Sequence, residues 1–232
     1  MTKRRKTRKE EQETLVDIVE VKEHAEDFFE RNQKPIVGVL GAIALIIGGY
    51  FAYKYFYKAP REKEASEQIF QAELQFERDS FELALLNPGG GYSGFLDIIE
   101  NYKGTDVANL ANYYAGICYL HLGKFEAAIS YLGDFSPGGD ITPIMKHGAM
   151  GDAYSELSQF DDAISEYRKA VQAGDNDFLT PYYLKKLGLL YEKQGDMASA
   201  LKTFQEIKKD YAKSQDGASI DKYIQRTQAA MN

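Results

Sequence analysis

Few side chains in this sequence are of types that carry out chemistry at a site. The chain has one cysteine, Cys118, and three histidines, His24, His121 and His147. A single cysteine excludes an intramolecular disulfide and a zinc site built from several cysteines. No serine or cysteine nucleophile pattern lies near His121 or His147. The sequence therefore predicts no catalytic residue, no metal ligand and no cofactor.

We expect the cysteine and two of the histidines to have structural roles. Cys118 lies between Ile117 and Tyr119 on a predicted buried helix, where a small core residue is expected rather than a reactive thiol. His147 takes a packing position on another helix. His121 ends a helix, where a partial positive charge suits the C-terminus.

Three glycines, Gly89, Gly91 and Gly94, match the spacing G-x-G-x-x-G of dinucleotide-binding loops. Such a loop must follow a strand and open a helix. Here the glycines follow a helical periodicity that runs from Ala65 to Asn87, and no strand pattern precedes them. We therefore interpret them as part of a turn that ends a helix.

The composition is that of a folded, acidic chain. Of 232 residues, 44% are hydrophobic and 27% are charged, and the net charge is -7. This charge argues against a general nucleic-acid binder, which needs surplus Lys and Arg for phosphate. Residues 35–53 carry no charge, and the acidic excess lies in residues 61–232.

The uncharged run predicts a single transmembrane helix. Nineteen helical residues reach roughly 28 Å, close to the thickness of the hydrocarbon core of a bilayer. An aromatic belt from Tyr50 to Tyr57 follows, as is typical of a membrane interface. The 34 residues before the run exceed an ordinary signal-peptide start, and no small-residue cleavage site follows. We expect an uncleaved anchor over 35–57; a buried helix of a soluble protein is the alternative.

Two further patterns flank or lie within the anchor. Small residues on one helical face would let another membrane helix approach closely, although glycine is also simply frequent in membrane helices. These residues are Gly41, Ala44, Gly48 and Ala52. The charged segment 1–34 contains an amphipathic helical stripe that would lie on the membrane surface or in water. Its apolar residues are Leu15, Ile18, Val19, Ala25, Phe28 and Phe29.

The rest of the chain repeats itself. Gly116, Gly151 and Gly188 begin the same pattern, 35 and 37 residues apart. Each glycine is followed by a turn position, an aromatic residue or methionine, an alanine and a large side chain. In order, these are Gly123, Ser158 and Gly195; Phe125, Phe160 and Met197; Ala128, Ala163 and Ala200; and Leu132, Tyr167 and Phe204. Glycine and alanine at such spacing let antiparallel helices cross closely, which predicts helix–turn–helix units.

This pattern resembles the tetratricopeptide repeat, and the resemblance implies an α-solenoid. Together with the predicted transmembrane helix before it, we expect an all-α fold. Three copies cover 109–212. Residues 58–108 are expected to form a linker helix and a degenerate first repeat, from a helix over 65–87 and a short helix near 93–102. A capping helix within 213–232 would cover the last apolar face.

In such repeats the first helix of each unit lines a concave face, and the equivalent positions here are candidates for a partner groove. They are Leu110, Tyr113, Ile117, Leu120, Met145, Asp152, Ser155, Tyr182, Lys185, Leu189 and Glu192. Apolar residues beside polar ones suit extended or partly unfolded polypeptide. As an alternative, Leu110, Ile117 and Leu120 pack against 65–102. An Hsp90-type carboxylate clamp is excluded, because Tyr113 and Ile117 replace its Lys and Asn.

The whole chain resembles the YfgM-like family, ancillary subunits of the bacterial Sec translocon. The resemblance rests on the order of the parts and on the juxtamembrane phrases at 28–34 and 50–54. It implies a single-pass inner-membrane protein with a cytoplasmic N-terminus and periplasmic repeats. It also implies association with the lipid bilayer, SecYEG, a membrane-anchored periplasmic chaperone of the peptidyl-prolyl isomerase type and secretory polypeptides, and it supplies no catalytic residue.

Charge alone leaves the orientation open. Basic residues on the two sides of the anchor are nearly equal in number, and only the six between Lys3 and Lys9 favour a cytoplasmic N-terminus. The alternative function is therefore a tetratricopeptide receptor or adaptor that faces the cytosol, such as an organelle import receptor. An enzymatic role is the third hypothesis, since it requires a ligand pocket that no sequence motif indicates.

Overall fold

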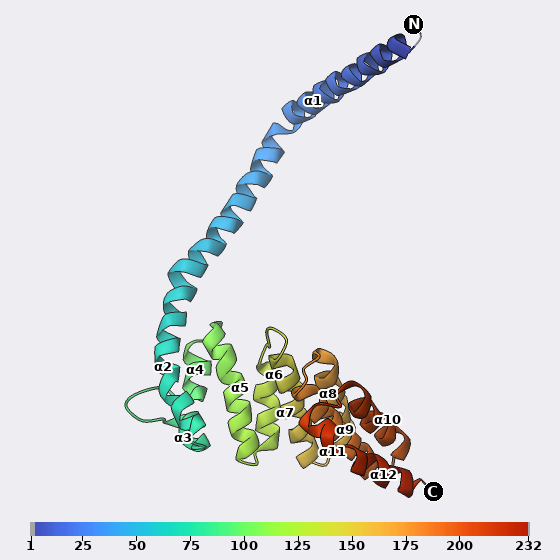
Figure 1. Ribbon diagram of the computed structural model, residues 1–232. Coiled ribbons are helices and arrows are strands. Elements are labelled where there is room, and N and C mark those ends of the chain that lie inside the picture. The colour runs from blue at the N-terminus through green and yellow to red at the C-terminus, as the bar shows by residue number, and fades with distance from the viewer. Residues whose placement is uncertain (1–2, 232) are drawn as a thin grey trace. The chain divides into compact units, whose positions relative to one another are not determined.

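The computed structural model describes the backbone of residues 3–231 and the side chains of residues 28–231 (Figure 1). All its elements in this range are helical, as predicted. The chain divides into two compact units, Met1–Ala59 and Pro60–Asn232. The predicted stripe from Leu15 to Ala25, His24 and the basic side chains before residue 10 lie outside the described side chains.

The N-terminal unit is helical throughout its described length. Helix α1 (Lys3–Ala52) continues through Pro35 into the π-helical segment η1 (Tyr53–Lys58), so the predicted segments 1–34 and 35–57 share one helix. Because proline has no backbone N–H group, α1 lacks one hydrogen-bond donor at Pro35. The helical stretch Phe28–Glu77 is long and apolar enough to span a membrane, and no residue of its most apolar window is buried. Its exposed face includes the predicted belt of Tyr and Phe.

The C-terminal unit begins with helices α2 (Ala59–Glu77), α3 (Phe81–Leu86) and α4 (Phe95–Asn101). Three antiparallel pairs follow. They are α5 (Asp106–His121) with α6 (Phe125–Asp134), α7 (Thr142–Glu156) with α8 (Phe160–Ala173), and α9 (Leu179–Lys193) with α10 (Met197–Asp210). Two short helices, α11 (Gln215–Ser219) and α12 (Asp221–Ala230), close the unit.

The single helix predicted over 65–87 is wrong, because the chain turns inside it. Asp79 adopts a left-handed conformation with φ of 56° and separates α2 from α3. The turn lets Phe76 and Phe81 pack edge to face, with ring centroids 5.8 Å apart. Both helices keep apolar residues on the side facing α4 and α5, so their periodicity continues across the break. The glycine-rich loop follows α3 and precedes α4, as expected for a helix-ending turn.

Each helix pair is held by a glycine that lies directly under a large side chain. A Cβ built on Gly116 would lie 2.5 Å from Leu132 Cγ, and one built on Gly151 would lie 2.5 Å from Tyr167 Cδ1. In the third pair, a Cβ on Gly188 would lie 2.3 Å from Phe204 Cε1. The predicted close crossing of glycine and large residue is therefore confirmed in all three copies.

The predicted turn positions share one backbone conformation. Gly123, Ser158 and Gly195 have φ values of 69°, 59° and 79°, in the left-handed region. Glycine adopts this conformation without strain, whereas serine does so at a cost of about 1–2 kcal/mol. The second pair therefore contains the least favourable of the three turns.

The buried residues form two clusters. The first joins α2, α3 and α4 to one side of α5 through residues that include Ala65, Phe95 and Ala111. The second runs through α7 to α10 and ends with Ile220, which precedes α12, and Ile224 on α12. The short C-terminal helices thus contribute buried residues to the last part of this cluster.

We predict that Gly151→Ala lowers the free energy of unfolding by about 1–3 kcal/mol, since the added methyl overlaps the Tyr167 ring. Gly133→Ala is the matched control: a Cβ there meets no atom within 4 Å. It should leave stability unchanged or raise it by up to about 1 kcal/mol. Urea unfolding followed by circular dichroism measures both, and equal effects would contradict the close-crossing argument.

Candidate binding groove

The first helices of the three pairs line an open pocket of about 640 Å³, a size typical of ligand-binding clefts. Four predicted groove residues lie in its wall: Leu120, Asp152, Ser155 and Leu189. The second helices contribute Phe125 and Tyr167. The remaining lining residues are His121, Gly123, Glu156, Lys186, Leu190 and Lys193.

Asp152 is the centre of the polar part of this pocket. Its Oδ1 accepts hydrogen bonds from the Tyr167 hydroxyl and from Lys186 Nζ, each at 2.6 Å. The Lys186 ammonium also lies 4.7 Å from the centroid of the Tyr182 ring, within range of a cation–π interaction. Helices α7, α8 and α9 are thus linked through one carboxylate.

Both partners of this ion pair are about three-quarters buried, with side-chain exposures of 26% for Lys186 and 25% for Asp152. Burial by itself would lower the pKa of Lys186, but the charge and hydrogen bond of Asp152 outweigh it, so the pKa is raised. Lys186 therefore stays charged at neutral pH, and its charge is satisfied by Asp152 within the protein.

A layer of tyrosines lies beside the pair. The rings of Tyr167 and Tyr183 stack with centroids 6.1 Å apart. A Cβ on Gly148 would lie 1.9 Å from Tyr183 Cζ, so the ring rests directly on the backbone of α7. Burial raises the pKa of Tyr113 to about 12, and burial together with the Asp152 charge raises the pKa of Tyr167 and Tyr183.

Two predicted groove residues point elsewhere. Lys185 forms an ion pair with Asp216 on α11. Glu192 accepts hydrogen bonds from Arg226 and Thr227 on α12. Helices α11 and α12 therefore occupy the positions that these side chains would offer to a partner.

The other predicted residues lie near the pocket's helices but outside its lining. Leu110 is exposed, whereas Tyr113, Ile117, Met145 and Tyr182 are half-buried. In the described part of the chain, α5 contributes Ala108, Ala111, Ala115 and Cys118 to the cluster shared with α2–α4. Leu110, Ile117 and Leu120 are not members of that cluster, so the predicted alternative role in packing against 65–102 is not seen.

Sequence reasoning missed Lys186 and gave Tyr167 only a packing role. Lys186 follows Lys185 directly, and one residue rotates the side chain by about 100° around a helix. Nothing in the sequence separates the lysine that faces Asp152 from the one that faces α11. Tyr167 was singled out by the repeat pattern, but its hydroxyl contact with Asp152 depends on the crossing of α7 and α8.

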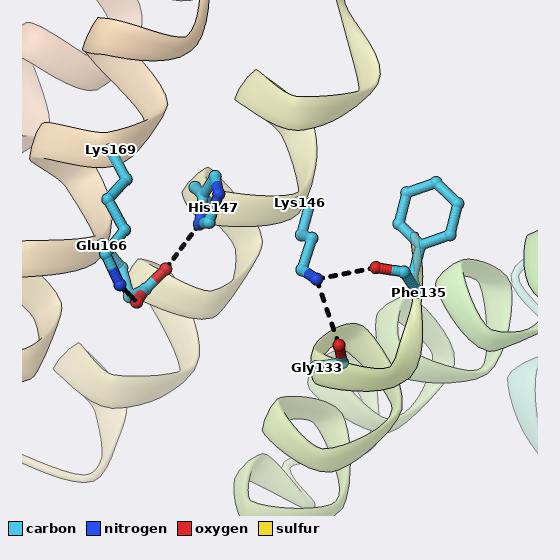
Figure 2. Close-up of polar contacts among 6 residues, drawn as sticks. All are labelled: Gly133, Phe135, Lys146, His147, Glu166 and Lys169. Carbon is cyan, nitrogen blue, oxygen red and sulfur yellow. Dashed lines mark hydrogen bonds and ion pairs between the residues drawn. The ribbon is translucent and has the colours of Figure 1, made fainter. Parts of the chain in front are cut away.

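His147 forms a polar contact in place of the predicted packing role. Its Nδ1 lies 2.7 Å from Oε2 of the buried Glu166 on α8, whose other oxygen accepts from Lys169 at 2.6 Å (Figure 2). The preceding residue, Lys146, points to the other side of α7. Its ammonium donates to the carbonyl oxygens of Gly133 and Phe135 at 3.1 and 2.6 Å.

These two neighbours hold α7 between its adjacent helices. Lys146 places a cation at the C-terminal end of α6, where the helix dipole favours it. Lys169 forms an ion pair with the Glu166 carboxylate and His147 contacts its other oxygen, so the buried carboxylate is not left without partners. Lys146 thus joins the second pair to the first, and His147 joins the two helices of the second pair.

The remaining candidates for chemistry have structural surroundings. Cys118 is fully buried, and burial raises the pKa of its thiol to about 12, so it is a core residue as predicted. His121 ends α5, as expected, and its ring stacks on Phe81 with centroids 4.4 Å apart. Gly41 and Gly48 in α1 have no atom within 4 Å of an added Cβ, and the role of their face stays a prediction.

Residues 149–216 match the family model of the tetratricopeptide repeat. This range takes in the second half of α7, all of α8, α9 and α10, and the start of α11. The C-terminal unit carries tetratricopeptide repeats. The α5–α6 pair has the same glycine, turn and alanine positions as the two matched pairs. No curated protein matches the chain.

We predict that the repeats lose stability above about pH 10, because unfolded tyrosines ionise there while Tyr113, Tyr167 and Tyr183 stay protonated in the folded state. A group with a raised folded pKa stabilises fully below its unfolded pKa and loses that contribution as pH rises. Tyr167→Phe should make the decline shallower by up to about 1.4 kcal/mol per pH unit.

Urea unfolding between pH 8 and pH 11 measures this slope. Tyr92→Phe, at an exposed tyrosine outside the pocket, is the matched control. A slope no shallower in Tyr167→Phe than in this control would contradict the argument.

Proposed function

We propose that this protein is a membrane-anchored scaffold without catalytic activity, and that its repeats hold polypeptide partners in the pocket of α5, α7 and α9. Tetratricopeptide repeats mediate protein–protein interaction, and a helix able to span a membrane precedes them in this chain. The observation that carries the proposal is the pocket itself, which combines apolar walls with a polar floor.

The chemistry of the pocket favours a peptide segment with an apolar side chain. Leu120, Phe125 and Leu189 supply apolar wall, and burying an apolar side chain of the partner there is favourable. Asp152 and Lys186 already satisfy each other's charge. An apolar side chain of the partner can therefore bind beside them without covering an unpaired charge. Lys193 and Glu156 on the lining offer polar contacts to the partner's backbone.

The pocket has little of what catalysis requires. A nucleophile needs a base within hydrogen-bond reach and a third group that orients the base. One of the pocket's two carboxylates, Asp152, instead binds Lys186 and a tyrosine whose raised pKa keeps it protonated. Its histidine, His121, stacks on Phe81. The groups present therefore support a binding role.

The finer proposal is association with the Sec translocon. The resemblance to the YfgM-like family supports an inner-membrane anchor, periplasmic repeats, and SecYEG, a peptidyl-prolyl isomerase-type chaperone and emerging secretory chains as partners. Within the membrane, the face of Gly41, Ala44, Gly48 and Ala52 would pack against neighbouring helices, since small residues allow close approach. The alternative is a cytosol-facing tetratricopeptide receptor.

We predict that a photo-crosslinking amino acid at Leu189 captures translocon subunits, the chaperone or secretory chains in cells expressing the full-length protein. The same amino acid at Gln205, an exposed position on α10 outside the pocket, is the matched control. Mass spectrometry of the adducts should find these polypeptides at Leu189 and much less of them at Gln205. Equal yields at the two positions would contradict a pocket that binds partners.

Protease protection tests the orientation. With tags at residues 1 and 232 in right-side-out spheroplasts, we predict digestion of the C-terminal tag and protection of the N-terminal tag. Protection of the C-terminal tag, with digestion after the membrane is permeabilised, would instead place the repeats in the cytosol. The translocon proposal would then be wrong and the receptor alternative would replace it.

A further inference from the structure

The connections between successive helix pairs lie along one edge of the C-terminal unit, the edge at which α2 begins (Figure 1). At this point the Arg61 guanidinium donates to the carbonyl oxygen of Asn101, just before the α4–α5 connection. The Glu62 carboxylate accepts from the backbone N–H groups of Asp106 and Val107 at 2.8 and 2.9 Å. The start of α2 is therefore fastened to the start of α5.

The same edge continues through the later pairs by direct contacts. The Asn109 side chain exchanges two hydrogen bonds of 2.8 Å with the backbone of Ser136 in the α6–α7 connection. A Cβ on Gly174 would lie 2.9 Å from the Asp140 carbonyl oxygen, so the α8–α9 connection touches the α6–α7 connection. We call the connections 102–105, 135–141 and 174–178, together with the start of α2, the loop edge.

Two large apolar side chains project from the loop edge at equivalent positions. Ile141 directly precedes α7 and Phe178 directly precedes α9. Their exposed fractions are 49% and 66%, and Phe178 is the most exposed of the large hydrophobic residues in 60–231. Because the two recur at the same place in consecutive pairs, they form a repeated feature of this edge.

Covalent reach limits how far the loop edge lies from the anchor. The aromatic belt of the anchor ends at Tyr57, and Arg61 follows four residues later. Four residues span at most about 14 Å even when fully extended. Neighbouring helices pack roughly 10 Å apart, so Ile141 and Phe178 lie some tens of ångströms along the same edge. The loop edge therefore begins within about 14 Å of the end of the aromatic belt.

We propose that the loop edge rests on the membrane interface, with the side chains of Ile141 and Phe178 inserted at the boundary between headgroups and acyl chains. This inference depends on the proposed anchor. Amphipathic surfaces bind this boundary by burying apolar area. Asp140 and Asp177 stand next to the two apolar residues, so insertion is driven by apolar burial into neutral lipid and not by attraction to anionic headgroups.

The arrangement would also orient the pocket. Leu120, Ser155 and Leu189 lie toward the far ends of α5, α7 and α9, away from the loop edge. A helix of 15 residues is about 22 Å long. With the loop edge on the membrane, the pocket opens about this distance above the lipid, where a polypeptide partner can reach it.

The test uses tryptophan as a reporter, because the sequence contains none. Ile141→Trp and Phe178→Trp are made separately in the full-length protein and reconstituted into phosphatidylcholine vesicles with or without brominated acyl chains. Leu122→Trp is the matched control, since Leu122 is an exposed apolar residue in the turn at the opposite end of α5. Phe51→Trp reports on the anchor itself. Circular dichroism checks that each variant keeps its helix content.

We expect brominated lipid to reduce emission about twofold at positions 51, 141 and 178, because tryptophan settles at the membrane interface, and to leave position 122 almost unchanged. Quenching at 51 without quenching at 141 and 178 would overturn this inference and leave the anchor intact. Equal quenching at 122 would also overturn it, since the unit would then adsorb without a preferred edge. No quenching at 51 would show that the proposed anchor itself is wrong.

Discussion

The close crossing of two helices at a glycine is the contact on which the repeats depend. At Gly116, Gly151 and Gly188 the second helix of the pair places a large side chain where a Cβ would otherwise be. The contact allows no change of register, because a shift by one residue would bring a larger side chain to the crossing. It therefore sets the position of each second helix, and through it the position of the next pair.

Tyr167 shows how this packing contact also creates the pocket. Its ring covers Gly151 and stacks on Tyr183, while its hydroxyl holds Asp152. Asp152 in turn binds Lys186 on α9. One side chain thus connects the crossing of the second pair to the floor of the pocket, and the third pair is joined to the second through the same carboxylate. A partner that enters the pocket would contact all three pairs at once.

Different contacts close the two ends of the repeat unit. At the C-terminal end, α11 and α12 bury Ile220 and Ile224 and pair with Lys185 and Glu192, so they complete the core and block part of the predicted groove. At the N-terminal end, α2 is held to α5 by Arg61 and Glu62, close to its connection with the anchor.

The sequence by itself determined the elements that follow from periodicity: an uncharged helical run, and three helix pairs with their glycine crossings and turn positions. These depend on residues close together in the chain. It could not place the turn at Asp79, because apolar spacing is the same on both sides of it. Only the tertiary structure decided that Lys186, and not Lys185, faces Asp152, that His147 binds Glu166, and that Ile141 and Phe178 share an edge. Such contacts join residues from different helices, and their geometry depends on how the helices rotate as they pack.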